Sequence, residues 1–247
     1  MNGNGSVAII PARYQSSRLP GKPLKEIEGR TLIEHVYRRV ELAEGLDRIV
    51  VATDDGRIQE AVEAFGGDAI LTRTDHESGT DRLAEAAADM PDDTIVINVQ
   101  GDEPLIEPEL IEKALTAARL GDVDVVTLMT PLSDPKASAD PNNVKVVADK
   151  NGLAMYFSRS PIPSSGPCFL HLGLYAYTAS FLRYFTRLEP TRLERAERLE
   201  QLRILEHGYK IRVVEVQSES WGIDTPADLA AFQAFLERNR VKSADNG

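Results

Sequence analysis

The sequence predicts an α/β fold: a Rossmann-like, mixed and mostly parallel sheet flanked by helices. Short apolar runs, typical of buried strands, alternate with segments whose apolar residues recur at helical spacing. Glycine and proline separate the two kinds of segment. A chain in which strands and helices alternate pairs its strands in parallel, because each helix crosses back over the sheet. With 247 residues, of which 42% are hydrophobic and 27% charged, we expect a single domain over residues 1–247.

The first half of the chain carries the clearest alternation. Strands are expected over residues 7–12, 46–52, 69–71, 94–99 and 123–129, with helices over 31–44, 55–65, 78–90 and 108–120. In chain order, the first five predicted elements alternate as β-α-β-α-β. This order is typical of a doubly wound parallel sheet.

The second half begins with a hairpin, residues 143–149 and 153–158, around a strong turn signal at residues 149–152. A strand over 171–177, helices over 179–186 and 192–207, and a strand over 210–217 follow. The final helix is expected to start at Pro226, with Thr225 as its N-cap. We expect residues 143–178 to form a small subdomain that serves sugar binding or dimerisation.

Charge and composition exclude several classes of function. The net charge of -11 and the pI of about 4.9 argue against a nucleic-acid or membrane-surface partner. The lone Cys168 rules out an internal disulfide, and the four histidines lack metal-ligand spacing. No apolar run reaches membrane-spanning length. We therefore expect a soluble, cytoplasmic protein that binds anionic ligands only through local Lys/Arg clusters and metal ions.

One such cluster lies in the loop after the first strand, at Arg13, Arg18 and Lys22. Pro20, Gly21 and Pro23 prevent this loop from continuing as strand or helix. In open α/β sheets ligands bind at the carboxyl ends of strands, so the loop is a candidate polyphosphate site. The alternative is a surface loop with scattered basic residues. The glycine patterns of P-loops and dinucleotide-binding folds are absent, which weakens any NAD or FAD interpretation.

Two aspartates are candidate magnesium ligands. Asp102 follows the strand over 94–99 directly, in the tight turn 100–104. A charge at that edge needs a partner, and Mg²⁺ takes one or two carboxylates together with phosphate oxygens. Alternatively, Asp102 only caps the helix that follows. Asp224 lies just outside the cap of the final helix and is free for another role.

Three further features each have a structural and a functional interpretation. Ser78 or Thr80 caps the helix over 78–90, and that N-terminus could also bind anionic or nucleotide groups. His171 shares a strand face with Tyr175 and Tyr177, which indicates either a structural histidine or a sugar-binding surface. Glu200 and Arg203 lie three residues apart on one helix face, and a solvated charged face is favoured there.

At this point five stretches together resemble the nucleotide-sugar cytidylyltransferases, most closely those that act on 3-deoxy-manno-octulosonate (Kdo). The likeness runs from about residue 7 to 230 and implies a fold of the nucleotide-diphospho-sugar transferase type. The stretches are residues 10–13 with 18–24, residues 76–82, residues 99–104, residues 156–159 with 171–173, and residues 199–203 with 224–226.

The resemblance implies that the protein converts CTP and Kdo into CMP-Kdo and pyrophosphate, with Mg²⁺ as cofactor and as a homodimer, in lipopolysaccharide biosynthesis. The catalytic residues that it implies are Arg13, Lys22, Asp102 and Asp224, the last two as the Mg²⁺ ligands. Nucleotide contacts are implied for Pro11, Ala12, Arg13, Lys22, Arg73, Ser78 and Gln100, and sugar contacts for Gln100, Arg159, His171, Tyr175, Glu200 and Gln201. Arg159 suits a clamp on the sugar carboxylate, because guanidinium binds carboxylates bidentately.

Two alternatives stay open at this level. CMP-sialic acid synthetases share the opening motif and the chemistry, although residues 200–203 favour Kdo. A non-catalytic nucleotide-binding protein could keep the fold, but the presence of Lys22 and both aspartates argues against it. The loop over 163–171 is short for the family, which leaves open a sugar altered at C8.

Overall fold

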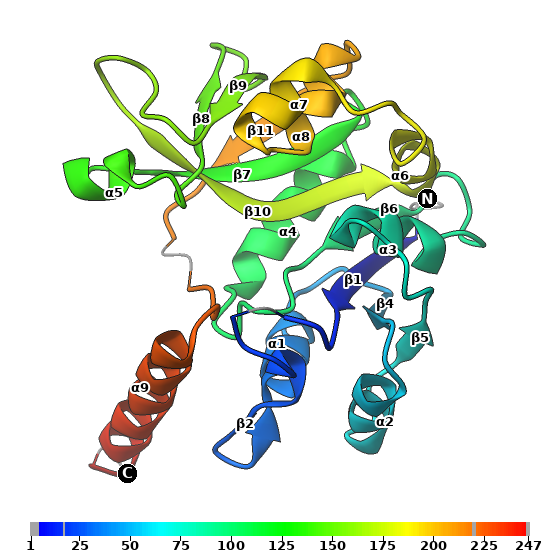
Figure 1. The fold of residues 1–247 in the computed structure, drawn as a ribbon, viewed down its shortest axis with the longest axis vertical. Helices are drawn as coiled ribbons and strands as arrows, with labels where there is room; N and C mark the ends of the chain where they lie inside the picture. Colours follow the sequence, from blue (N-terminus) through cyan, green and yellow to red (C-terminus); the bar gives the residue numbers. More distant parts are fainter. Residues whose placement is uncertain (1–4, 17, 219–220, 246–247) are drawn as a thin grey trace.

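Nine strands form one sheet through the centre of the computed structural model, which describes residues 5–16, 18–218 and 221–245 (Figure 1). Seven of them follow the order β11-β7-β10-β6-β1-β4-β5. Their bounds are β1 Ser6–Ala12, β4 Arg48–Thr53, β5 Ala69–Leu71, β6 Ile95–Asn98, β7 Val125–Pro131, β10 Phe169–Thr178 and β11 Ile211–Glu215. Only β10 runs antiparallel to its neighbours in this path, β6 and β7. The predicted mixed, mostly parallel sheet is confirmed.

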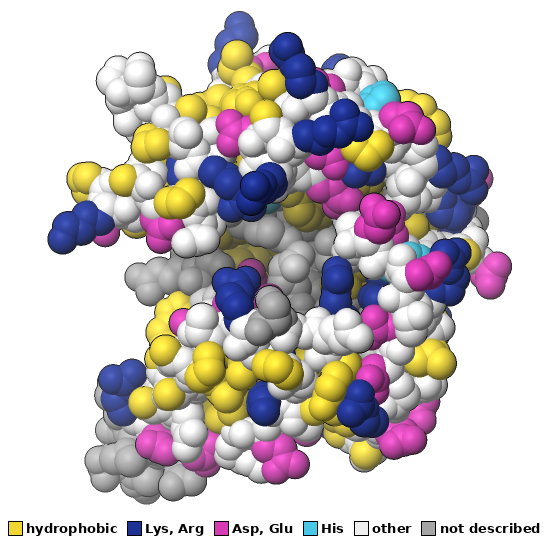
Figure 2. Space-filling model, in the orientation of Figure 1, with side chains coloured by type: hydrophobic (Ala, Val, Ile, Leu, Met, Phe, Trp, Pro, Cys, Tyr) yellow, Lys and Arg dark blue, Asp and Glu magenta, His cyan; other side chains and the backbone are white. Residues whose placement is uncertain are grey.

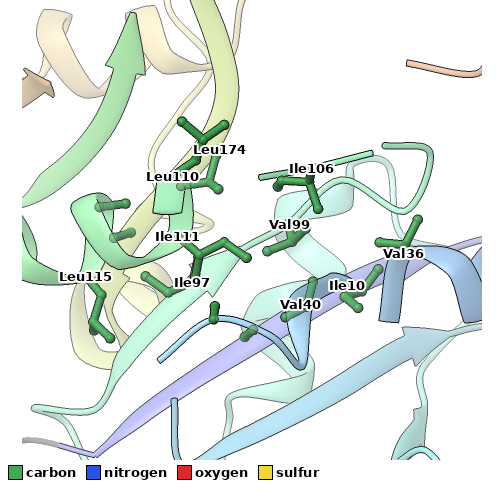
Figure 3. Packing of buried hydrophobic residues seen from close by; sticks show 14 of the residues in the cluster. Ile10, Val36, Val40, Ile97, Val99, Ile106, Leu110, Ile111, Leu115 and Leu174 are labelled. Atoms are coloured by element: carbon green, nitrogen blue, oxygen red, sulfur yellow. The ribbon is translucent and has the colours of Figure 1, made fainter. Parts of the chain in front are cut away.

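Helices cover both faces of the sheet and build a core on each. On one face lie α1 (Leu32–Val40), α2 (Gly56–Ala64) and α4 (Pro108–Ala118), and on the other α3 (Gly79–Ala86), α6 (Ala179–Phe185) and α8 (Gln201–Glu206). Figure 3 shows the first core, where Ile111 of α4 and Val36 of α1 pack against strand residues such as Ile10. Alternate residues of β1 face opposite cores, which is why its sequence is apolar throughout.

The predicted hairpin is confirmed as β8 (Lys145–Ala148) and β9 (Ala154–Ser158), and β8 also pairs with β10. The subdomain role predicted for residues 143–178 stays a prediction. Four short elements were not predicted from the sequence. They are η1 (Lys22–Leu24), β2 (Glu26–Ile27), β3 (Arg30–Thr31) and α5 (Pro135–Ala139).

The single helix predicted over residues 192–207 is wrong, because the chain forms α7 (Arg192–Glu197) and α8 instead. Arg198 between them takes a left-handed conformation with φ 56°, which ends α7 and turns the chain. The turn leaves the Glu197 carboxylate free to accept from the Ser158 hydroxyl (2.8 Å) and the Arg159 N–H (2.9 Å). The Glu197 carboxylate at the end of α7 therefore holds the end of β9 in place.

The last helix, α9 (Pro226–Asp245), belongs to a third, smaller core. Its Phe232 is fully buried with Leu19 and Ile27 of the opening segment, Leu32 of α1, and Ile223. Thr225 caps this helix as predicted, since its hydroxyl accepts from the Asp228 N–H at 3.2 Å. Residues near both ends of the described chain are thereby packed together. Among the described helices, none has the length and apolar character that crossing a membrane requires.

Candidate active site

The basic loop after β1 folds back on itself and brings Lys22 towards the carboxyl edge of the sheet. Gly21 makes the turn in the left-handed conformation (φ 65°), and its N–H donates to the Tyr14 carbonyl at 3.0 Å. The Lys22 N–H donates to the Leu19 carbonyl at 3.1 Å and opens the short helix η1. Ser17, within this loop, lies outside the described residues. The turn predicted at Gly21 is confirmed, although the chain goes on from it as a short 3-10 helix that includes Pro23.

Asp102 reaches the same edge from β6, because Gly101 lets two backbones approach closely. A Cβ atom on Gly101 would lie 2.7 Å from the Pro11 carbonyl oxygen of β1, closer than real Cβ contacts allow. Only glycine fits there without movement of the backbone. The Ile223 N–H donates to the Asp102 carbonyl oxygen at 2.9 Å, which ties the segment before α9 to this turn.

Three residues that the sequence singled out therefore meet, although they lie far apart in the chain. The Lys22 Nζ atom donates to Asp102 Oδ2 at 2.7 Å, to Asp224 Oδ1 at 3.1 Å and to the Ile223 carbonyl at 2.9 Å. Arg18 contacts the other oxygen of Asp224, Oδ2, at 2.9 Å. The two carboxylates thus converge on a single cation at the end of the basic loop.

A cleft of about 470 Å³ opens beside this cluster, and the surface is hollowed between groups of Lys and Arg side chains (Figure 2). Six of its lining residues are sequence predictions: Pro11, Ala12, Arg13, Lys22, Gln100 and Asp102. Arg18 also lines the cleft, so three cations of the opening loop face it. Such a cleft has the charge that a triphosphate needs.

Arg82 also lines the cleft, and sequence reasoning gave it no site role. Its side chain is buried, with Nη2 2.8 Å from Asp54 Oδ2 and Nη1 bonded to the Thr72 hydroxyl. It therefore joins α3 to the segments that follow β4 and β5. The only sequence signal for Arg82 is its position directly after the Ser-Gly-Thr-Asp helix start. Its partners Asp54 and Thr72 lie far away in the sequence, so no local pattern predicts the contacts.

The chemistry of these residues fits a magnesium ion. Two carboxylate oxygens face one point, and Mg²⁺ usually binds one or two carboxylates together with phosphate oxygens and water. No group of three or more His, Cys, Asp or Glu side chains suited to a metal ion occurs within residues 5–16, 18–218 and 221–245. Asp102 and Asp224 therefore fit the predicted role of Mg²⁺ ligands, and that role stays a prediction.

The face of β10 that carries the predicted sugar residues is aromatic. The His171 ring lies 5.3 Å from that of Tyr175, which stacks on Tyr177 at 5.7 Å. The shared face predicted for these three residues is confirmed. His171 Nε2 lies 2.8 Å from Thr127 Oγ1 and forms a hydrogen bond with that hydroxyl. Burial lowers the pKa of His171 to about 3, so the ring is neutral.

Glu200 and Gln201 lie where α8 begins, and Gln201 is buried. The Thr80 hydroxyl donates to Glu200 Oε2 at 2.5 Å, and burial raises the pKa of the Glu200 carboxyl. Arg203 lies 3.9 Å from Glu200, as predicted, but also binds Glu194, and both Arg203 and Glu194 are largely shielded from water. The solvated charged face favoured from the sequence is therefore wrong. Gln100 Nε2 donates to the Gly173 carbonyl of β10 at 2.9 Å.

Several predicted site residues do not line the cleft that contains Lys22, and three of them, Arg73, Ser78 and Arg159, make contacts elsewhere. Arg73 forms an exposed ion pair with Asp75 at 2.8 Å and lines a neighbouring cleft of about 520 Å³. Ser78 caps α3 by accepting from the Asp81 N–H at 3.1 Å and lines another of about 570 Å³. Arg159 donates to the backbone carbonyls of Glu197 and Pro141, both at 3.0 Å. Their substrate roles stay predictions.

The fold and this site define a class of protein, and comparison with known proteins agrees. The cytidylyltransferase family model matches residues 7–211. The chain belongs to the cytidylyltransferase family. A solved structure of CMP:2-keto-3-deoxy-manno-octonic acid synthetase complexed with CTP is 45% identical, with a TM-score of 0.91 over 96% of this chain and 100% of that one. A 4-diphosphocytidyl-2C-methyl-D-erythritol synthase from Anaerococcus prevotii is 18% identical, with a TM-score of 0.64 over 96% and 97%, which shows the fold alone.

Curated relatives identify two related activities within the family. The 3-deoxy-manno-octulosonate cytidylyltransferase of Syntrophobacter fumaroxidans is 52% identical over 95% of this chain and 98% of its own. The 8-amino-3,8-dideoxy-manno-octulosonate cytidylyltransferase of Shewanella pealeana is 48% identical over 92% and 97%. The resemblance seen in the sequence is confirmed, and the sugars of these relatives differ only at C8.

Proposed function

We propose that this protein transfers CMP from CTP to the anomeric hydroxyl of Kdo, forming CMP-Kdo and pyrophosphate for lipopolysaccharide biosynthesis. The observation that carries the proposal is the convergence of Asp102, Asp224 and Lys22 at the end of a basic loop. The relatives named for Kdo, at 52% identity over nearly the full chain, support Kdo as the sugar. A non-catalytic nucleotide-binding protein would not need two carboxylates aimed at one cation.

The phosphate chemistry requires little covalent work from the protein. The sugar hydroxyl attacks the α-phosphorus in line and pyrophosphate leaves, so catalysis rests on positioning and on stabilising charge. Arg13, Arg18 and Lys22 face the cleft and would hold the triphosphate. As the bond to the leaving group breaks, negative charge grows on the pyrophosphate, and the same three cations stabilise it there.

Asp102 and Asp224 would hold the cofactor, Mg²⁺. When bound, Mg²⁺ supplies positive charge to the phosphates and lowers the pKa of the attacking hydroxyl. The contribution of the protein chain itself is to fix the positions of the two carboxylates. Gly101 and the hydrogen bond between Ile223 and Asp102 do this through the backbone, without relying on flexible side chains.

The aromatic face of β10 and the start of α8 provide the groups for a sugar acid. His171 offers a neutral imidazole, Tyr175 a hydroxyl, and Glu200 a carboxyl held by Thr80. We assign these groups and Gln201 to the sugar hydroxyls, and Arg159 to the sugar carboxylate. Three N–H groups of the Arg159 guanidinium already donate to carbonyls, so two of its five donors remain for a carboxylate.

The test is pyrophosphate release from CTP and Mg²⁺, measured with and without Kdo. Release that depends on Kdo supports the proposal. Turnover with N-acetylneuraminate and none with Kdo would transfer the protein to sialic acid activation. No release with either sugar, from a protein shown to be folded, would favour the binding protein.

A second candidate sugar is 8-amino-3,8-dideoxy-manno-octulosonate, because a relative named for it is almost as similar to this chain as those named for Kdo. The same assay with both sugars in competition measures the ratio of the two kcat/KM values. A ratio above one for Kdo supports the first candidate, and the inverse supports the second. We also propose that the enzyme works in the cytoplasm and that it is a homodimer. Sedimentation of the purified protein tests the homodimer.

A further inference from the structure

The Lys22 ammonium group stands at the point where Asp102 and Asp224 converge. It donates to both carboxylates and to the Ile223 carbonyl, which satisfies all three of its hydrogens. Only 15% of the Lys22 side chain is exposed, against 30% for Asp102 and 44% for Asp224. Lys22 therefore pairs with both carboxylates, and Arg18 with the second oxygen of Asp224, at the place where the proposed Mg²⁺ would need the oxygens that Lys22 binds.

Backbone contacts and packing that do not involve the Lys22 side chain bring together the two segments that carry the aspartates. Gly101 fixes the turn before Asp102 against the backbone of β1, and the Asp102 carbonyl accepts from the Ile223 N–H. Ile223 is buried with Leu19 and Phe232, so packing holds the segment that carries Asp224. If the ammonium moved away, the two carboxylates would remain close together with less compensating charge.

We propose that Lys22 is an internal competitor for the divalent cation and leaves the carboxylates when nucleotide arrives. Lysine suits this exchange, because its ammonium is a point charge on a flexible stem. The cleft that Lys22 lines is also faced by Arg13 and Arg18, so a bound triphosphate would offer the ammonium an alternative anion nearby. The exchange makes tight metal binding dependent on CTP. This inference rests on the proposed function, since it assumes a triphosphate in the cleft.

Manganese binding to the nucleotide-free protein tests the competition directly. Free Mn²⁺ is measured by electron paramagnetic resonance during titration of the wild type and of Lys22→Met. We expect Lys22→Met to bind Mn²⁺ about tenfold more tightly, because a unit charge is removed next to two partly exposed carboxylates. In Lys22→Met combined with Asp102→Asn the gain should disappear.

Lys25→Met is the matched control, since it removes the same charge from an exposed position three residues away. Its Mn²⁺ affinity should stay within about twofold of the wild type, as expected for an exposed charge outside the cluster. Lys22→Gln, measured in parallel with thermal unfolding of each variant, covers a failure of Lys22→Met to fold. Equal Mn²⁺ affinity in the wild type and the folded Lys22 variant would overturn the proposal, and so would equal tightening in Lys25→Met.

These titrations contain neither CTP nor Kdo, so they are independent of the turnover assay. Lys22→Met could bind Mn²⁺ more tightly while the wild type releases no pyrophosphate. That result would support the competition between Lys22 and the metal and would refute the proposed function. Kdo-dependent release without any change in Mn²⁺ affinity would keep the proposed function and refute the competition.

Discussion

Gly101→Ala places the catalytic geometry under a defined strain. The new Cβ would lie 2.7 Å from the Pro11 carbonyl oxygen, so the two backbones must separate by about 0.7 Å to reach ordinary contact. Overpacking of this kind costs about 1–3 kcal/mol of unfolding free energy. Because Asp102 is the next residue, its carboxylate moves with the turn, and a misplacement near 1 Å can lower kcat about 10²-fold.

The prediction is checked by urea unfolding and by pyrophosphate release under saturating substrates. Gly222→Ala is the matched control: it lies two residues before the other aspartate, and among the described residues other than its chain neighbours no heavy atom stands within 4 Å of its added Cβ. We expect that control to keep wild-type stability within about 0.5 kcal/mol. A Gly101→Ala protein with unchanged stability and turnover would show that the contact between this turn and β1 does not position Asp102.

The remaining predictions concern single side chains. Asp102→Asn should stay folded in thermal melts and lose about 10³-fold in pyrophosphate release, and turnover like the wild type would remove Asp102 from the site. Lys22→Ala should raise the KM for CTP more than the KM for Kdo; equal increases would contradict a phosphate role. Arg82→Met leaves the Asp54 carboxylate without its partner and should cost about 3 kcal/mol in urea unfolding, partly restored by adding Asp54→Asn. Because the unfolded chain binds a proton on His171 near pH 6.5 and the folded protein only near pH 3, His171 should lower stability as the pH falls through that window. His171→Gln should reduce this loss between pH 7 and 5, and an unchanged slope would place the proton elsewhere.

Much of the fold follows from local sequence. Continuous apolar runs such as residues 7–12 are short for helices and indicate strands buried on both faces, and parallel strands bring their ends to one edge. This is why Lys22 and Asp102, each after a strand, were predicted together and are found 2.7 Å apart. The His171 and Tyr175 face followed equally from the alternation along one strand.

What the sequence did not reveal depends on contacts between distant segments. The break at Arg198 has no local signal, because helical spacing continues on both sides of it. The ion pair between Arg82 and Asp54 joins two residues that lie 28 positions apart in the sequence. Arg159 was expected as a substrate clamp, yet its guanidinium is largely engaged by carbonyls of α7 and of Pro141, which only the tertiary fold brings near.

The packing of Phe232 has a consequence for how the enzyme is made. Asp224 is held in place by a helix whose buried anchor comes late in the chain. During translation the sheet and the basic loop can form while the ribosome still holds this segment, but the second carboxylate is not yet in place. A nascent or proteolytically trimmed chain that lacks α9 would therefore keep much of its sheet while Asp224, the second of the two carboxylates proposed to hold Mg²⁺, lacks its support.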